Sequence, residues 1–228
     1  MSTALEMSEA TKNMGGLDVS YRPGTADEQV LDLVLAHNRY GFPADMTGMT
    51  VVDIGAHIGS ATMLCASRGA TVYAYAPCRD NFVLCRRNIR GSSAFVHQQA
   101  VGKPGIRTLY LNPKNTASNG NRALAEGNSG DYETVLAEWV SLRMVFDDNG
   151  IDRCDWLKMD CEGDEIDVIP QILEMHDCIG VVVGEVHAGQ WPNPTPDLDR
   201  RINDAVASLD AFYTRTQISN CEYRWEHR

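Results

Sequence analysis

A short apolar run that ends in a glycine-containing turn constrains the fold of this chain more than any other feature. Residues 50–54 have the pattern of a buried strand, Gly55 and Gly59 follow, and a helical pattern begins at Ala61. Glycine lets a backbone turn tightly and lets a ligand approach it closely. In open α/β sheets, ligands bind at such carboxyl ends of strands, where helix N-termini present amide groups. The segment therefore predicts an α/β fold with a binding crevice at this turn.

The spacing of this turn is D-x-G-x-x-x-G, counted from Asp53, and it differs from the dinucleotide pattern G-x-G-x-x-G. A glycine turn alone is a weak signal, and a purely structural strand–helix turn is the alternative. The spacing also counts against a nicotinamide-dependent dehydrogenase, which is a rival function for a fold of this class.

Strand and helix patterns alternate along the chain, which predicts a largely parallel sheet covered by helices on both faces. An amphipathic helix is predicted over 27–40, before the first of these strands. Strands are predicted over 50–54, 71–76, 94–98, 107–111, 155–160 and 179–185, with two more strand-like segments up to Trp225. Helices are predicted over 61–68, 80–90, 165–174 and 197–209.

Two segments carry no clear pattern. Residues 1–15 are polar and are predicted to form a disordered tail, which leaves 16–228 as a single domain. Residues 112–131 are rich in Gly, Asn and Ser, and they are either a substrate-binding loop or a flexible insertion.

The composition restricts the partners and the location of the protein. A formal charge of −11 argues against nucleic acid as a partner, because binding a phosphate backbone relies on a Lys/Arg patch. The seven cysteines form no CxxC pair, so neither a disulfide framework nor a cysteine-based zinc site is expected. No apolar run reaches the length of a membrane span, and we expect a cytoplasmic protein that does not bind membranes. The oligomeric state is left open, with a homodimer as one option.

Several motifs together resemble the FkbM family of S-adenosylmethionine (SAM) dependent methyltransferases. The most specific is the string K-x-D-x-E-G-x-E that begins at Lys158. The other segments are 21–27, 51–60, 74–77, 100–102 and 184–187. The resemblance implies a Rossmann-like class I methyltransferase fold with about seven strands, and SAM as methyl donor. It also implies O-methylation of a small-molecule hydroxyl, such as that of a natural product or a sugar.

The same resemblance implies a set of cofactor-binding residues. By motif position, Asp53, Gly55 and Gly59 would line the methionine end of SAM, Gln99 would lie near the adenine, and Asp160 beside the transferred methyl. The full set is Tyr21, Asp53, Gly55, Ala56, His57, Gly59, Ala76, Pro77, Asn81, Gln99, Ala100 and Asp160.

Ala76 departs from the family pattern, since relatives normally carry an acid there that accepts hydrogen bonds from the ribose hydroxyls. Losing a charged acceptor forfeits roughly 1.5–3 kcal/mol. We expect weakened but retained SAM binding, with water or Asp80 in place of the acid. A SAM-cleaving or SAM-cyclising enzyme and a non-catalytic nucleotide-binding module are the alternatives. His57 stands where relatives often have Asn, and either side chain can hydrogen-bond a carboxylate.

The candidate catalytic residues lie at two strand ends. Lys158 and Asp160 share one side of the first strand, and Glu185 and His187 share one side of the second. His187 is the first choice as general base because its unperturbed pKa lies near neutrality, and Asp160 is the second. Asp160, Glu185 and His187 could instead form a divalent-metal site. Glu165 is assigned a capping role at the start of a helix.

Overall fold

The computed structural model describes residues 8–111, 133–187, 196–219 and 221–228. Its centre is a seven-stranded sheet with the order β11-β12-β10-β9-β3-β4-β5. Only β12 runs antiparallel to its neighbours in that sheet. The predicted α/β class with a mostly parallel sheet of about seven strands is confirmed. The strands are β3 Thr50–Ile54, β4 Thr71–Tyr75, β5 Ala94–His97, β9 Cys154–Met159, β10 Ile179–Glu185, β11 Tyr213–Gln217 and β12 Glu222–His227.

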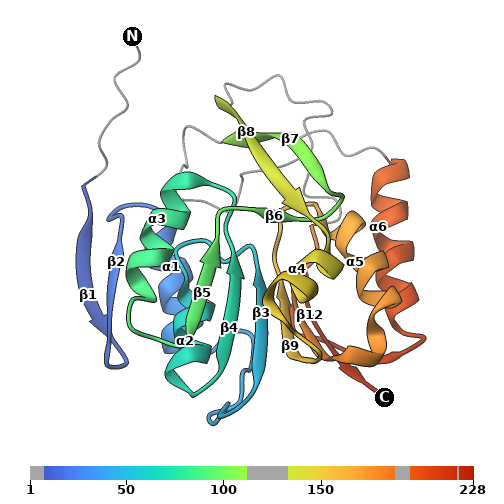
Figure 1. The fold of residues 1–228 in the computed structure, drawn as a ribbon, viewed down its shortest axis with the longest axis horizontal. Helices are drawn as coiled ribbons and strands as arrows, with labels where there is room; N and C mark the ends of the chain where they lie inside the picture. The colour runs from blue at the N-terminus through green and yellow to red at the C-terminus, as the bar shows by residue number, and fades with distance from the viewer. Residues whose placement is uncertain (1–7, 112–132, 188–195, 220) are drawn as a thin grey trace.

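Helices cover both faces of this sheet (Figure 1). One group packs on the face that includes Val51, Val72 and Ala74, and it consists of α1 Ala26–Leu31, α2 Ser60–Ser67 and α3 Arg79–Asn88. The other group packs on the face that includes Val52 and Leu157, and it consists of α4 Leu142–Asn149, α5 Glu165–Glu174 and α6 Pro196–Leu209. Burial on both faces explains why the central strands are mostly apolar. No helix in the described part of the chain is both long and apolar enough to cross a membrane.

A second, three-stranded sheet lies over the carboxyl end of the main sheet (Figure 1). It consists of β6 Ala100–Val101, β7 Gly105–Leu111 and β8 Glu133–Val140. The sequence predicted β7 alone of these three strands. The inner face of the β7–β8 pair is apolar, and Leu109 and Trp139 are buried on it. This sheet therefore forms a wall beside the strand ends at which a ligand was expected.

The N-terminal region differs from the prediction in two places. Strand β1 Ala10–Met14 pairs with β2 Leu17–Tyr21 in a hairpin that contacts α3, so residues 10–14 are not part of a disordered tail. The helix predicted over 27–40 ends its α-helical part at Leu31 and continues as the π-helical segment η1 Asp32–Ala36. Arg39 and Tyr40 then lie in a turn that leads to β3.

The remaining predicted helices and strands begin and end within two residues of their expected positions. Neither α4 nor the short 3-10 helix η2 His176–Cys178 was predicted from the sequence. Residues 112–131, predicted to be a substrate loop or an insertion, lie outside the described residues.

Candidate active site

The turn after β3 is held between its two neighbouring strands. Gly55 has a φ of +78°, and a Cβ at this position would overlap the carbonyl oxygen of Asp160 at the end of β9. The amides of Gly55 and Ala56 both donate to the carbonyl of Tyr75, at 3.1 and 2.9 Å. These two amides are therefore used by the sheet, whereas the sequence suggested that the turn would offer its amides to a ligand.

His57 continues this turn in a left-handed conformation, with a φ of +54°. Its Nε2 lies 3.2 Å from a carboxylate oxygen of Asp27, a residue with no exposed surface. Arg22 donates to both oxygens of that carboxylate and also to Oδ1 of Asn81 on α3. Burial would raise the pKa of Asp27, but the hydrogen bonds from His57 and Arg22 outweigh it and lower the pKa to about 2. The network links the N-terminal segment to the turn and to α3.

A cavity opens at the carboxyl ends of β3, β4 and β9, with about 690 Å³ of empty space that includes the part open to solvent. Its lining residues are Ile54, Gly55, His57, Tyr75, Ala76, Pro77, Cys78, Asn81, Ala100, Val101, Leu109, Trp139, Asp160, Cys161, Glu162 and Asp164. We call it the first cavity. Its lining combines an apolar slot with acids at one end and polar side chains at the other.

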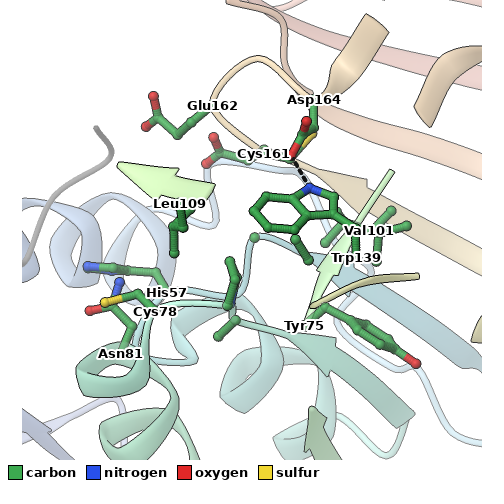
Figure 2. A pocket seen from close by; sticks show the side chains of 16 residues that line it. His57, Tyr75, Cys78, Asn81, Val101, Leu109, Trp139, Cys161, Glu162 and Asp164 are labelled. Carbon is green, nitrogen blue, oxygen red and sulfur yellow. Dashed lines mark hydrogen bonds between the residues drawn. The ribbon is translucent and has the colours of Figure 1, made fainter. Parts of the chain in front are cut away.

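Trp139 from β8 stands across the first cavity (Figure 2). Its indole nitrogen donates to Asp164 at 2.7 Å, while His57, Cys78 and Asn81 lie together on the other side. Burial raises the pKa of Asp164 to about 7, against the opposing effects of Trp139 and Arg107. The hydrogen bond fixes the ring plane, so the slot between Trp139 and Ala76 has a defined wall.

A smaller cavity of about 370 Å³ lies beside the first and shares Gly55, His57 and Asp160 with it. We call it the second cavity. Its other lining residues are Val30, Arg39, Tyr40, Ala56, Ser60, Ala61, Lys158 and Glu185. Asp160 thus stands where the two cavities meet.

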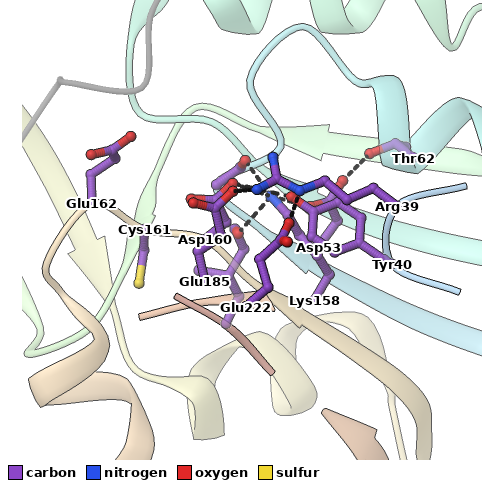
Figure 3. A network of polar contacts seen from close by, with 12 residues as sticks. Arg39, Tyr40, Asp53, Thr62, Lys158, Asp160, Cys161, Glu162, Glu185 and Glu222 are labelled. Atoms are coloured by element: carbon purple, nitrogen blue, oxygen red, sulfur yellow. Dashed lines mark hydrogen bonds and ion pairs between the residues drawn. The ribbon is translucent and has the colours of Figure 1, made fainter. Parts of the chain in front are cut away.

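Lys158 anchors the floor of the second cavity. Its Nζ donates to the carbonyl of Gly55 at 2.7 Å and lies 3.3 Å from Oδ1 of Asp53 (Figure 3). Burial alone would lower the pKa of Lys158, but the carboxylates of Asp53 and Asp160 outweigh it and raise the pKa above its ordinary value. Lys158 stays protonated and positions the turn, so it is not suited to accept a proton.

Asp160 and Glu185 face each other across the second cavity (Figure 3). The hydroxyl of Tyr40 donates to Oδ2 of Asp160 at 3.2 Å, and Arg39 pairs with Oε1 of Glu185 at 2.8 Å and with Glu222. Burial would raise the pKa of Asp160, but Lys158 and His187 outweigh it and lower the pKa. Burial and the charge of Asp160 raise the pKa of Glu185.

His187 lies behind these carboxylates and is buried. Its Nδ1 lies 2.8 Å from Oε1 of Glu165, which has no exposed surface. Burial would lower the pKa of His187, but Glu165, Glu162 and Asp160 together raise it to about 10. A histidine that is already protonated at neutral pH cannot accept the proton of a hydroxyl, and this argues against the role of general base.

The structure brings most of the predicted residues to the two cavities and leaves five outside their lining. Gly55, Ala56, His57, Ala76, Pro77, Asn81, Ala100, Lys158, Asp160 and Glu185 line one or both cavities. Tyr21, Asp53, Gly59, Gln99 and His187 line neither.

Each of these five has another structural setting. Asp53 accepts the hydroxyl of Thr62 at 2.6 Å and supports the turn from below. A Cβ at Gly59 would lie 2.8 Å from Sγ of Cys85, so this glycine permits close packing of α2 on α3. Tyr21 packs against an apolar cluster that includes Val19 and Leu31. Gln99 donates to Glu138 of β8. Likewise Glu165, expected to cap a helix, binds His187.

The sequence did not identify Arg39, Tyr40, Leu109, Trp139 or Asp164 as site residues. Arg39 and Tyr40 were assigned to the end of a helix, and Trp139 lies in a segment without a prediction. Asp80, a proposed substitute for the missing ribose acid, is exposed and does not line the first cavity, whereas its neighbour Asn81 does. The available signal for β8 and Trp139 was the apolar run over residues 135–140, which only Glu138 interrupts.

Comparison with known proteins identifies the family. Residues 53–223 match the methyltransferase FkbM domain. A curated relative, hexuronic acid methyltransferase AglP of Haloferax volcanii, is 22% identical over 159 residues, which cover 69% of this chain and 63% of AglP. The match thus spans less than two thirds of that relative.

The solved structures that the chain matches are more distant in sequence. A putative O-methyltransferase from Klebsiella pneumoniae has a TM-score of 0.48 and 13% identity, with 87% of this chain and 90% of that chain covered. The tRNA (uracil-54, C5)-methyltransferase of Pyrococcus abyssi, solved with S-adenosyl-L-homocysteine, has a TM-score of 0.48 and 12% identity, with 96% and 43% covered.

The family match covers most of the chain, including the turn after β3 and the string that begins at Lys158. Together with the seven-stranded sheet, it confirms the Rossmann-like class I methyltransferase fold that the sequence predicted. The chain belongs to the FkbM methyltransferase domain family.

Proposed function

We propose that this protein binds SAM in the first cavity and transfers its methyl group to an oxygen of a small-molecule acceptor. The observation that carries the proposal is the first cavity itself. It lies at the carboxyl ends of β3, β4 and β9, where the strand order reverses between β3 and β9, and it joins the second cavity at Asp160. Ligands of open α/β sheets bind at this kind of position.

The lining of the first cavity fits the parts of SAM. The slot between Ala76, Val101 and Trp139 is apolar and flat on one side, which suits an adenine ring. Asn81 and His57 offer polar atoms on the side where the ribose would lie. Because Ala76 provides no carboxylate, the ribose loses a charged partner, and we propose that Asn81 takes over part of its role.

The acids at the junction suit the reacting end. When bound, SAM supplies an electrophilic methyl group on a positively charged sulfur. Asp160 and Glu162 line the first cavity and favour a cation there. The second cavity, lined by Asp160, Glu185 and Tyr40, would hold the acceptor oxygen. Good orientation of two reactants can contribute ~7–11 kcal/mol to the rate enhancement.

Calorimetric titration with S-adenosylhomocysteine tests the cofactor part of the proposal. We expect binding that is measurable below millimolar concentration and that is lost in Ala100→Phe, whose ring would fill the slot. Ala207→Phe makes the same change at an exposed position of α6 and should bind normally. Absence of binding by the unchanged protein at millimolar ligand would refute the proposal.

Transfer itself is tested with methyl-labelled SAM and a panel of hydroxyl- and carboxyl-bearing sugars. A hexuronic acid is the first acceptor to try, because the relative AglP is a hexuronic acid methyltransferase. Labelled acceptor together with S-adenosylhomocysteine would support methyl transfer. Methylthioadenosine formed from SAM alone would instead support the SAM-cleaving alternative, and binding without any product would support a non-catalytic module.

A further inference from the structure

The ring nitrogen Nε2 of His187 faces a group of carboxylate oxygens. Oδ1 of Asp160 and Oε2 of Glu185 each lie 3.8 Å from Nε2, and Oε2 of Glu162 lies 3.7 Å away. These separations are longer than a hydrogen bond. One ligand atom each from Asp160, Glu185 and His187 lies within 4.8 Å of the other two.

Each of these three side chains makes a hydrogen bond or an ion pair through one polar atom. Its other polar atom faces the space between the three side chains. Asp160 is held through Oδ2 by Tyr40, and Glu185 is held through Oε1 by Arg39 (Figure 3). His187 is held through Nδ1 by the carboxylate of Glu165. Oδ1, Oε2 and Nε2 therefore face one another, and Oε2 also lies 3.8 Å from Sγ of Cys221.

This arrangement is the one that protein metal sites use. A ligating histidine almost always gives its second ring nitrogen to a carboxylate or carbonyl, which fixes the ring orientation, and ligating carboxylates are themselves hydrogen-bonded. Here Glu165 is such an outer partner of His187, and it is fully buried. A group of side chains that served only for ion pairing or helix capping would not need a buried imidazole nitrogen beside its two carboxylates.

The charges around the point also favour a cation. Six carboxylates surround three cationic groups, Arg39, Lys158 and the protonated His187, and His187 must release its Nε2 proton when it binds an ion. The carboxylates are those of Asp53, Asp160, Glu162, Glu165, Glu185 and Glu222. Asp160 and Glu185 line the second cavity, so an ion could reach them from solvent.

We propose that Asp160, Glu185 and His187 bind one divalent cation at the junction of the two cavities. Two carboxylate oxygens and one imidazole nitrogen suit Mn²⁺ or Mg²⁺, which prefer oxygen ligands and keep open positions for water or substrate. An acceptor with hydroxyl or carboxylate oxygens would bind the ion through the second cavity, and the ion would lower the proton affinity of that oxygen. This role rests on the proposed function, whereas binding of the ion does not.

The role would also explain how an oxygen-rich acceptor enters an acidic site. Without an ion, Asp160 and Glu185 would repel a carboxylate or a developing alkoxide. With an ion between them and the acceptor, the interaction becomes attractive.

The test is titration of the full-length, chelator-treated protein with Mn²⁺, followed by calorimetry and by the electron paramagnetic resonance signal of free Mn²⁺. We expect one ion per chain in the absence of SAM. His187→Ala and Glu185→Gln should each weaken binding by at least about 100-fold, and Glu165→Gln by about 10–100-fold, as for outer partners of metal ligands.

His176 and His227 provide a matched control. With Asp177 they form the other group in the described residues that could hold an ion, and two of the three are exposed. The double variant His176→Ala/His227→Ala should bind Mn²⁺ as the unchanged protein does. Loss of binding in this control with retention in His187→Ala would overturn the proposal, as would no uptake by the unchanged protein at millimolar Mn²⁺.

Two further measurements separate the possible failures. Glu185→Gln and Glu165→Gln keep side-chain shape, so the result does not depend on whether His187→Ala folds. Titration with S-adenosylhomocysteine is run in parallel. Mn²⁺ binding without cofactor binding would support the ion site and refute the proposed function. Cofactor binding without Mn²⁺ uptake would refute the ion site and leave the proposed function standing.

Discussion

Replacement of Lys158 by Met should destabilise the protein strongly while leaving the shape of the side chain nearly unchanged. The ammonium group lies 2.7 Å from the carbonyl oxygen of Gly55 and 3.3 Å from Oδ1 of Asp53. Both side chains of the ion pair are almost completely buried, so water does not replace the lost partner. Breaking a buried pair by removing one member costs ~3–5 kcal/mol, because the other charge is left uncompensated.

The second substitution isolates the cause. Asp53→Asn removes the stranded charge and keeps an oxygen that can accept the hydroxyl of Thr62. We therefore expect the double variant Asp53→Asn/Lys158→Met to be more stable than Lys158→Met alone, with a coupling free energy of roughly 1–3 kcal/mol. Arg200→Met is the surface control, since its pairs with Asp197 and Asp204 are exposed and contribute less than ~1 kcal/mol.

Urea unfolding followed by tryptophan fluorescence measures the free energies of unfolding of the unchanged protein, the two single variants, the double variant and Arg200→Met. Trp139 and Trp225 are fully buried and report on the core. A loss of less than ~1 kcal/mol in Lys158→Met, in the range of a surface substitution, would refute the reasoning. The reasoning would also be refuted if the loss of unfolding free energy in the double variant equalled the sum of the losses in the two single variants.

Three further predictions concern the turn and the first cavity. Gly55→Ala should lower the free energy of unfolding in urea by at least ~2 kcal/mol, because its Cβ would overlap the Asp160 carbonyl. Gly48 also has a positive φ but has open space around it, so Gly48→Ala should cost only ~1–2 kcal/mol. Folded Asp164 keeps its proton up to a pH of about 7 and the unfolded residue ionises near 3.8, so stability falls as pH rises between these values. Asp164→Asn should remove this loss, and its advantage in urea unfolding should grow from pH 5 to pH 8 by up to ~3 kcal/mol. An unchanging difference would contradict the assignment. Ala76→Asp should tighten binding of S-adenosylhomocysteine by roughly 10-fold or more in calorimetry, and no change would contradict a ribose at this position.

The sequence predicted the elements that carry a local pattern. The central strands are mostly apolar and most helices have apolar stripes, so their limits were found within two residues, except for the helix predicted over 27–40. The turn at Gly55 was recognised for the same reason, because its glycines are needed locally. The overall sheet and the place of the ligand followed from the alternation of strand and helix.

Features that depend on contacts distant in sequence were not predicted. Strand β8 is completed by pairing with β7 across residues 112–132, and its outer face is mostly polar or exposed, which hid Trp139. The π-helical turn after α1 redirects Arg39 and Tyr40 toward Glu185 and Asp160, more than a hundred positions away. Likewise, the neutral pKa expected for His187 ignored Glu165, whose carboxylate reaches it only in the folded chain.

The attachment of the β3 turn on three sides has a consequence for recognition. Tyr75, Lys158 and the close approach of Asp160 hold Gly55 in place in the absence of any ligand. The conformational entropy of this loop is lost when the protein folds, so an incoming molecule meets a rigid surface and need not order it. Relatives with the same turn can therefore diverge in the walls that surround it, and so in the acceptors they select, while the rigid centre stays unchanged.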